Sequence, residues 1–221
     1  MAVGAAKSSR QVWDIGVRIF HWLLAICFLI AWQSAEQDNF FVHRIAGYTI
    51  LTLILFRIGW GIWGGETARF VQFVRGPGAV FGYLKSLPAR KPSHWLGHNP
   101  LGALAVLALI GLMLAQVGTG LFAIDTDFVK EGPLSANISY DAARQSAELH
   151  EAIFNLLMTV VIVHILAVFF YLVWKKENLI GPMLTGKAVG SGASARPGSP
   201  VLFILTAAGA AAMVWAIVTF G

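Results

Sequence analysis

Five long apolar stretches constrain the fold of this chain more than any other feature of its sequence. Each is long enough to cross about 30 Å of hydrocarbon as a helix that rises about 1.5 Å per residue. The stretches are residues 15–34, 41–63, 101–124, 150–174 and 201–220. Charged residues make up 12% of the chain and its mean hydropathy is +0.70, whereas soluble domains are about 25% charged. The sequence therefore predicts an all-α integral membrane protein, and it excludes a disordered chain, an ordinary cytosolic enzyme and a nucleic-acid binder.

The last apolar stretch is set apart from the other four by the segment before it. That segment, GSGASARPGSP, has the Gly, Ser and Pro content of a linker. We expect residues 1–187 to form a four-helix transmembrane bundle, residues 188–200 to form the linker, and residues 201–221 to add a fifth, C-terminal transmembrane helix. Asn99 and Pro100 supply the N-cap and the first helical position expected at the start of the third stretch.

The basic residues predict how the helices are oriented. Twelve of them lie near the N-terminus or between the second and third and the fourth and fifth stretches: Lys7, Arg10, Arg18, Arg69, Arg75, Lys85, Arg90, Lys91, Lys175, Lys176, Lys187 and Arg196. The segments on the other side carry only Arg44, Lys130 and Arg144, among several acids. By the positive-inside rule, the N-terminus is cytoplasmic and the C-terminus lies outside.

A cleaved signal peptide is the competing interpretation of the N-terminal segment, but His21 interrupts its apolar run.

Four of the six histidines lie at or within the predicted spans. A titratable side chain inside a bilayer suggests a function, although a single histidine can also simply hydrogen-bond a neighbouring helix. His150 and His164 are about four turns apart, which places them on one helix face and about 21 Å apart along its axis. Because successive spans run in opposite directions, depth pairs His43 with His150 on the outer side and His21 with His164 on the cytoplasmic side.

Two facing pairs of neutral imidazoles provide two axial ligand sets for haem iron, and the cores of helix bundles are where such cofactors bind. We therefore expect these four histidines to ligate two haems. Zinc is disfavoured because neither pair has a carboxylate or thiolate that would complete four ligands, and Glu151 is turned about 100° away from His150. The single cysteine, Cys27, excludes internal disulfides and a covalently attached c-type haem.

Residues near these histidines fit a haem. Gly47 lies one turn from His43, where a missing side chain lets a flat ring approach the helix. Arg18 and Arg44 can each offer a guanidinium to haem propionates, or they can be anchors that reach the membrane interface. Arg57 follows His43 by 14 residues and shares its helix face. It can neutralise propionates of the inner haem or contact a quinone oxygen, or it can be a simple cation near a helix end.

Four motifs within residues 11–187 together resemble one family. They are VWDIGVRIFHW; FVHRIAGYTILTLILFRIGWG; FVRGPGAVFGYLKSL with LGHNPLG; and ELHE with a histidine after twelve further residues and then KKENLIGPMLTGK. They resemble the bacterial cytochrome b561 family, and most closely its b-type cytochrome subunits of membrane-bound nickel–iron hydrogenases. The resemblance implies a four-helix bundle that binds two b haems through His21, His43, His150 and His164. The fifth helix departs from the pattern of that family.

The resemblance also implies a function in the bacterial inner membrane. Electrons would pass between the quinone pool and a redox partner on the periplasmic side, either a hydrogenase-like subunit or a c-type cytochrome. The chain would then be a subunit of a quinone-linked oxidoreductase, and whether it is itself an enzyme or forms a homodimer stays open.

Two further features bear on the quinone and on the partner. Quinone reduction consumes protons, and His98, at the cytoplasmic mouth of the third span, can titrate near neutral pH; alternatively, it stabilises the helix start through a local hydrogen bond. The predicted outer loop, residues 125–149, is net acidic. It can dock a basic partner, although translocated loops are in general poor in Lys and Arg.

Two other functions remain open. A self-sufficient superoxide:quinone oxidoreductase would keep both haems and would reduce quinone with superoxide without an added subunit. A non-redox transporter would use the histidines to bind a metal ion or relay protons. Broken helices or inverted repeats are common in transporters, and neither is evident in the sequence.

Overall fold

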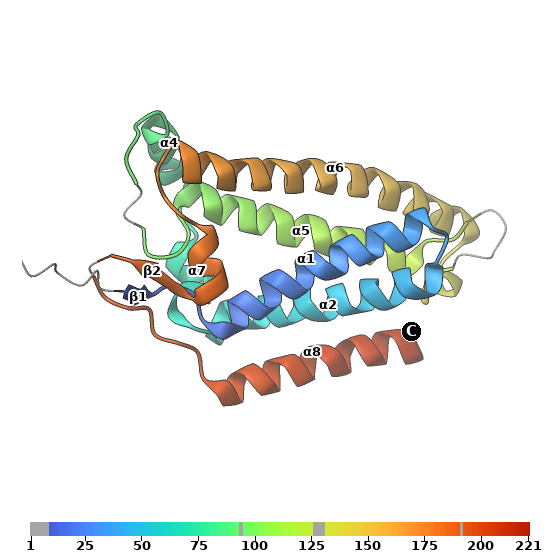
Figure 1. The fold of residues 1–221 in the computed structure, drawn as a ribbon. Helices are drawn as coiled ribbons and strands as arrows, with labels where there is room; N and C mark the ends of the chain where they lie inside the picture. Colours follow the sequence, from blue (N-terminus) through green and yellow to red (C-terminus); the bar gives the residue numbers. More distant parts are fainter. Residues whose placement is uncertain (1–8, 93–94, 126–130, 191) are drawn as a thin grey trace, which may run out of the picture.

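The structure is a computed structural model that describes residues 9–92, 95–125, 131–190 and 192–221. Lys7 and Lys130, which contribute to the predicted orientation, lie outside these ranges. Within them, five helices are long and apolar enough to cross a membrane, as predicted (Figure 1). They are α1 (Ile15–Glu36), α2 (Phe40–Trp63), α5 (Pro100–Phe122), α6 (Tyr140–Val173) and α8 (Pro200–Phe220).

Helix α6 begins ten residues before the predicted span. Its N-cap is Ser139, whose side chain accepts a hydrogen bond from the amide of Ala142. The residues that follow, YDAARQSAEL, include several good helix formers, so the helix extends through them. The prediction that residues 125–149 form an outer loop is therefore wrong for residues 140–149, which are helical. The 34 residues of α6 exceed the roughly 20 that a bilayer requires.

Side-chain caps fix where the other spans of the bundle begin. Asp14, Asn39 and Asn99 each accept a hydrogen bond from the amide three residues later, at 2.9, 3.3 and 2.8 Å. Each bond satisfies one of the amide groups that the first turn of a helix leaves unpaired. Pro100 is the first residue of α5, as the sequence predicted.

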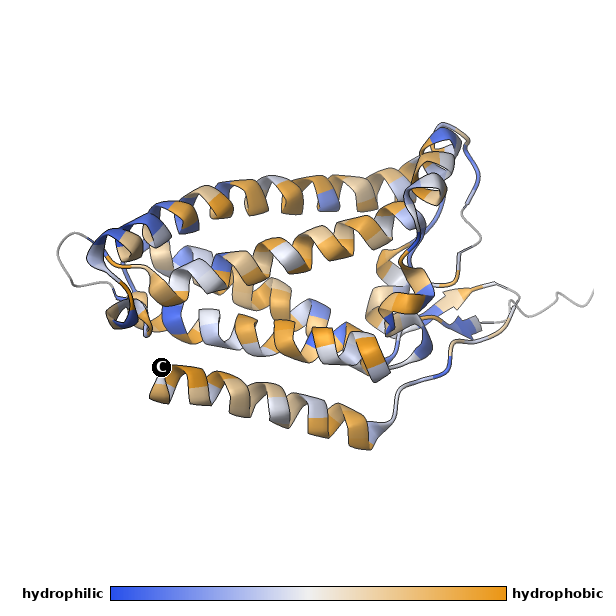
Figure 2. Ribbon diagram, turned by 180° about the vertical axis from the view of Figure 1, so that it is seen from behind, coloured by the Kyte–Doolittle hydropathy of each residue, from blue (hydrophilic) through white to orange (hydrophobic). Residues whose placement is uncertain are grey.

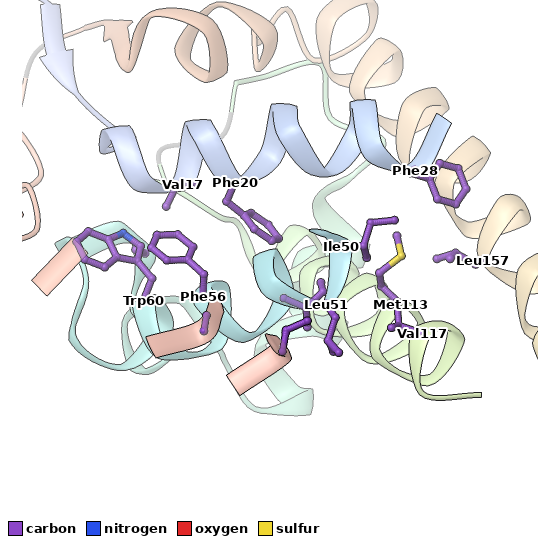
Figure 3. Packing of buried hydrophobic residues seen from close by; sticks show 14 of the residues in the cluster. Val17, Phe20, Phe28, Ile50, Leu51, Phe56, Trp60, Met113, Val117 and Leu157 are labelled. Atoms are coloured by element: carbon purple, nitrogen blue, oxygen red, sulfur yellow. The ribbon is translucent and has the colours of Figure 1, made fainter. Parts of the chain in front are cut away.

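The spans α1, α2, α5 and α6 pack as two antiparallel hairpins. α1 lies along α2 and α5 lies along α6, and α2 also contacts α5 (Figure 1). All four helices contribute to one apolar core, in which Phe28, Ile50, Met113 and Leu157 lie close together (Figure 3). Rings join the two hairpins on the α1–α6 side, where Phe28 stacks on Phe154 with 6.2 Å between ring centroids.

Helix α8 lies along the outer side of α2 (Figure 1). Its Phe203 packs edge-on against Phe56 and Trp60, with ring centroids 5.2 and 5.7 Å apart. Trp63 donates a hydrogen bond from Nε1 to Oγ1 of Thr206 at 2.7 Å. The fifth span is thus attached to one member of the bundle.

Short elements close one end of the bundle. β1 (Ser9–Gln11) pairs antiparallel with β2 (Lys187–Val189), and beside them lie η1 (Glu66–Ala68), α3 (Phe70–Phe73), α4 (Pro77–Ser86) and α7 (Ile180–Thr185). We call this end, residues 9–14, 64–92, 95–99, 174–190 and 192–199, the basic end. The other end, residues 37–39, 123–125 and 131–139 with η2 (Ser135–Asn137), is called the acidic end.

The segment predicted to be a linker is bonded to the basic end. The amide of Arg196 donates to Oε2 of Glu66 at 3.0 Å, and the Glu66 amide donates to the carbonyl oxygen of Arg196 at 2.9 Å. The amide of Ala195 donates to the carbonyl oxygen of Gln11 at 2.9 Å. These bonds fix the path by which the chain reaches α8.

The spans consist mostly of hydrophobic residues (Figure 2), and many of their large apolar side chains are exposed. Large side chains such as Ile45, Leu166 and Leu205 are 48%, 62% and 62% exposed. A soluble monomer rarely exposes so much contiguous apolar surface, whereas lipid tails are a favourable environment for it. Hydrophilic residues concentrate at the two ends (Figure 2), as expected of a multi-pass membrane protein.

Candidate functional site

Four histidines face one another in two pairs between α6 and the α1–α2 hairpin. The ring centroids of His43 and His150 are 6.1 Å apart, and those of His21 and His164 are 6.5 Å apart. These are the pairs that depth in the membrane predicted. The first pair lies toward the acidic end, because His43 is in the first turn of α2, and the second lies toward the basic end.

Backbone carbonyl groups orient both rings of the acidic-end pair. Nδ1 of His43 lies 2.8 Å from the carbonyl oxygen of Ala31, and Nδ1 of His150 lies 2.7 Å from that of Gln116. Since a carbonyl oxygen only accepts, each Nδ1 carries the proton and each Nε2 keeps a lone pair. This is the arrangement in which a histidine binds a metal through Nε2. The side-chain amide of Gln116, 3.0 Å from Nε2 of His150, donates to that lone pair.

A cavity of about 290 Å³ lies beside the acidic-end pair. Both histidines line it, together with Arg44 and Gly47. A Cβ atom on Gly47 would have no neighbour within 4 Å, so there is open space beside this glycine. Gly120 acts differently: a Cβ atom there would lie 2.8 Å from a carbon of the His150 ring. The position of this ring therefore requires a glycine on α5.

The basic-end pair contains a buried nitrogen without a hydrogen bond. Nδ1 of His21 has no partner among the described residues, and the ring packs edge-on against Trp22 at 5.0 Å. Buried polar atoms are nearly always paired. An unpaired one beside a second imidazole is suited to a ligand bound between the two rings.

Arg57 of α2 lies at the basic-end side of the bundle and is 2% exposed. Its guanidinium carbon is 4.9 Å from the centroid of the Phe70 ring and 6.0 Å from that of Phe20. Both terminal nitrogens are buried without a hydrogen-bond partner among the described residues. Burying a cation that makes no such bond is unfavourable, and the contacts that the structure shows for this guanidinium are with aromatic rings.

His98 lies between two aromatic rings, with centroid distances of 4.6 Å to Trp13 and 4.7 Å to Phe73. Part of the residue reaches solvent, but Nδ1 is buried without a partner among the described residues. Burial, followed by the positive charge of Arg57 and the imidazoles of the basic-end pair, lowers the pKa of His98 from 6.5 to about 3. The expectation that it titrates near neutral pH is therefore wrong.

The two other arginines predicted to flank the histidines have different surroundings. Arg44 is exposed and lines the acidic-end cavity, where it was expected. Arg18 donates from Nη2 to the carbonyl oxygen of Leu184 in α7, and its Nε is buried without a partner among the described residues. Arg18 therefore attaches α7 to α1.

Sequence reasoning missed one anchoring residue at the basic end. Asp14 accepts hydrogen bonds from Nε1 of Trp60 at 3.1 Å and from the amide of Gly65 at 3.0 Å, in addition to capping α1. It thereby joins the start of α1 to the end of α2, the two helices that carry His21 and Arg57. An aspartate directly before an apolar stretch is a helix-start signal, and that signal would have identified the cap.

Gln116 and Gly120 were also missed, because their roles depend on which face of α5 meets His150. A glutamine inside an apolar run was the available signal for Gln116.

Within the described residues, no three His, Cys, Asp or Glu side chains converge on one point. Two imidazoles at each level suit a metal whose other ligands come from a porphyrin.

The family model described as Prokaryotic cytochrome b561 matches residues 12–186 of the chain. The chain belongs to this family. It is therefore a transmembrane b-type cytochrome that binds haem and takes part in electron transport. The match covers the four helices of the bundle and ends before α8. No curated protein and no solved structure matches the chain significantly.

The geometry of this cytochrome fits b haem at both levels. A metal–imidazole bond measures about 2 Å, so two rings on opposite sides of one metal have centres about 6 Å apart. The two pairs have centroid distances of 6.1 and 6.5 Å. At the acidic end, each Nε2 is without a proton because Nδ1 carries it, and there is open space beside Gly47. The Gln116 amide, which donates to Nε2 of His150, would turn away from it when a metal binds.

Proposed function

We propose that this cytochrome binds two b haems and transfers electrons between the membrane quinone pool and a redox partner at its acidic end. His43 and His150 would ligate one haem, and His21 and His164 the other. When bound, haem supplies the reversible one-electron chemistry that the side chains lack. The observation that supports this proposal is the presence of two imidazole pairs at two depths of one bundle.

At the acidic end, the chain holds both ligands before any metal binds. The carbonyl groups of Ala31 and Gln116 keep the proton on Nδ1 of each ring, so no proton has to leave Nε2 for the metal bond to form. Arg44, at the rim of the cavity, would pair with propionates. Much of the remaining cavity lining is apolar, with residues such as Phe28 and Val117, and these side chains would limit the access of water.

At the basic end, Arg57 and His98 would bind the quinone. The guanidinium offers hydrogen-bond donors and a positive charge to a quinone oxygen, and it lies among aromatic rings that suit a quinone ring. His98 also lines a cavity of about 230 Å³. Because its pKa is low, His98 would hold a hydrogen bond as a neutral imidazole, and the protons for quinone reduction would come from water at this end.

The redox partner would bind at the acidic end, which the positive-inside rule places in the periplasm. Exposed acids there and at the start of the adjoining α6, Glu131, Asp141 and Glu148, favour a basic surface such as that of a c-type cytochrome or a hydrogenase-like subunit. The basic end, with most of the Lys and Arg residues, would then face the cytoplasm of a bacterial cell.

The test is a reduced-minus-oxidised absorption spectrum of the detergent-purified protein, with pyridine haemochrome quantification. We expect two b haems per chain. One haem would contradict the assignment of one pair, and a colourless protein that folds would contradict the proposal and favour transport. Quinone reduction by superoxide, without any added subunit, would favour the self-sufficient oxidoreductase over the partner-dependent function.

A further inference from the structure

A segment outside the membrane spans exposes large apolar side chains. It comprises residues 69–91, which include α3 and α4, and we call it the interfacial segment. Val71 is 78% exposed, Phe81 is 65% exposed, and Val74 and Leu84 are each 39% exposed. None of them belongs to a candidate span. Apolar side chains gathered in this way on a connecting segment indicate a surface that binds something apolar.

The charges of the interfacial segment all have one sign. It contains five basic residues and no Asp or Glu: Arg69, Arg75, Lys85, Arg90 and Lys91. Basic clusters of this size beside a transmembrane helix, mixed with apolar residues, are typical of segments that bind anionic lipid. The charge complementarity therefore favours a negatively charged membrane surface as the occupant.

Contacts with α6 fix the depth of α4 in the membrane. The hydroxyl groups of Tyr83 in α4 and Tyr171 in α6 are 2.9 Å apart. Nε1 of Trp174 donates to the carbonyl oxygen of Pro88 at 3.2 Å, and the guanidinium of Arg90 lies 4.5 Å from the ring centroid of Trp174. Tyr and Trp at the end of a span mark the membrane–water interface. Helix α4 therefore lies at that level, beside the end of α6 (Figure 1).

A buried lysine holds α4 in this position. Nζ of Lys175 donates to the carbonyl oxygens of Ala89, at 2.9 Å, and Ser86, at 3.3 Å. These carbonyl groups lie at and just beyond the C-terminal end of α4. A positive charge at the C-terminal end of a helix stabilises that helix. Tyr83 faces the protein, and Phe81 and Leu84, on other faces of the same short helix, face outward.

We propose that the interfacial segment lies in the headgroup region of the bilayer and binds anionic phospholipids. Phe81 and Leu84 insert among the upper acyl chains, and Arg75, Lys85 and Lys91 contact the phosphate groups. The site is built from residues that take no part in the histidine pairs, so the inference stands independently of the proposed haem ligands and quinone site.

Depth is tested with a spin label on the full-length protein in lipid nanodiscs. The label is placed at Phe81→Cys or, separately, at Leu84→Cys, in a Cys27→Ser background. Lys187→Cys, on the exposed strand β2 at the same end, is the control. We expect molecular oxygen to relax the labels at positions 81 and 84 more than an aqueous nickel complex does, and the reverse order at position 187.

Nickel accessibility at 81 and 84 equal to that at 187 would overturn the proposal. That result would mean that the interfacial segment faces water when only lipid is present. Its apolar side chains would then be more consistent with a surface that binds a partner protein. Two labelled positions are used so that a folding defect in one variant does not decide the outcome.

Lipid selectivity is tested with two variants of equal charge. One carries Arg75→Gln, Lys85→Gln and Lys91→Gln, and the other carries Lys176→Gln, Lys187→Gln and Arg196→Gln, all exposed and at the same end. Each is placed in nanodiscs of phosphatidylcholine and phosphatidylglycerol, and the lipid retained after mild extraction is measured by mass spectrometry. We expect the first variant to lose at least about half of the retained phosphatidylglycerol and the second to lose less. Equal losses would overturn the assignment to the interfacial segment.

Discussion

At the scale of single residues, the acidic-end histidines and His98 have contrasting environments. His43 and His150 each have Nδ1 bonded to a carbonyl group, and both line one cavity. His98 instead lies between two aromatic rings, beside a buried cation. The first environment presents a lone pair to a metal, whereas the second keeps an imidazole neutral.

Replacing His164 by Ala should remove only the basic-end haem. The haem content should fall from about two per chain to about one, because axial ligation of the acidic-end haem comes from other residues. His43→Ala should remove the other haem and leave a different residual spectrum. Pyridine haemochrome assay and redox titration measure both effects. His98→Gln is the control and should keep both haems, and a His164→Ala protein with both haems would show that the pairing is wrong.

The stability of the protein should decrease on mild acidification, partly through His98. Its pKa is about 3 in the folded protein and near 6.5 when unfolded, so the unfolded state binds the additional proton between these values. Stability therefore rises with pH in this window and falls as the pH drops from 6.5 toward 3. Thermal unfolding at pH 7.5 and 5 should show a smaller loss for His98→Gln than for the unchanged protein. Equal losses would exclude this role.

At the scale of single elements, α5 is the helix that supports His150. The Gln116 carbonyl bonds the ring, and Gly120, one turn later, leaves room for it. Gly118 lies between them in sequence but faces open space, since a Cβ atom there would meet nothing within 4 Å. Helix periodicity explains the difference, because residues four apart share a face and residues two apart do not.

Gly120→Ala should therefore disturb the acidic-end haem, and Gly118→Ala should not. The new Cβ atom at position 120 forces the His150 ring to move, and overpacking of this kind costs about 1–3 kcal/mol. In Gly120→Ala we expect the acidic-end haem to be present in a lower amount or to have a changed midpoint potential. Haem quantification and redox titration measure these two effects. Identical titrations for the two variants would show that the ring does not lie against Gly120 once haem is bound.

At the scale of the whole molecule, two helical hairpins are joined on the α1–α6 side largely by rings. The histidine pairs and the Phe28–Phe154 stack occupy the space between them. Helix α8 is attached to the outside through α2. The residues that line the acidic-end cavity come from the four bundle helices and the segment near Pro133, so the cofactor space does not depend on the fifth span.

Ending the chain after Ser199 should therefore preserve both haems and lower the unfolding temperature. The truncated protein loses the packing of Phe203 on Phe56 and Trp60 and the Trp63–Thr206 hydrogen bond, and one such bond contributes about 1 kcal/mol. Haem quantification and thermal unfolding in detergent measure the two effects. Loss of a haem from a folded truncated protein would show that α8 supports the cofactor space.

Much of this architecture could be predicted from the sequence because the membrane restricts the choices. Long apolar runs must form helices, since the bilayer offers no partners for backbone groups. Once the spans are known, their alternating directions set the depth of each histidine, and depth alone selected the pairs His43–His150 and His21–His164. Asn99 and Pro100 likewise marked the start of α5 by local chemistry alone.

Other features depend on packing between helices, which hydropathy does not encode. The carbonyl groups that fix the tautomers belong to Ala31 and Gln116, and no side-chain pattern indicates which backbone carbonyl groups will meet these rings. The environment of His98 arises from Trp13 and Phe73, far apart in the chain, and burial there moves its pKa away from neutrality. The start of α6 was predicted ten residues too late. Residues 140–149 form a helix, but they are not apolar enough to be recognised as part of a membrane span.

The sequence by itself determined the number of spans and the depth of the four histidines, since both follow from local composition and spacing, and its motifs carried the resemblance to the family. Only the tertiary structure decided which nitrogen of each acidic-end histidine carries the proton, that Arg57 is buried among rings, and that α4 is held at the end of α6. These features arise where side chains from different helices meet, and the geometry of such contacts exists only in the folded bundle.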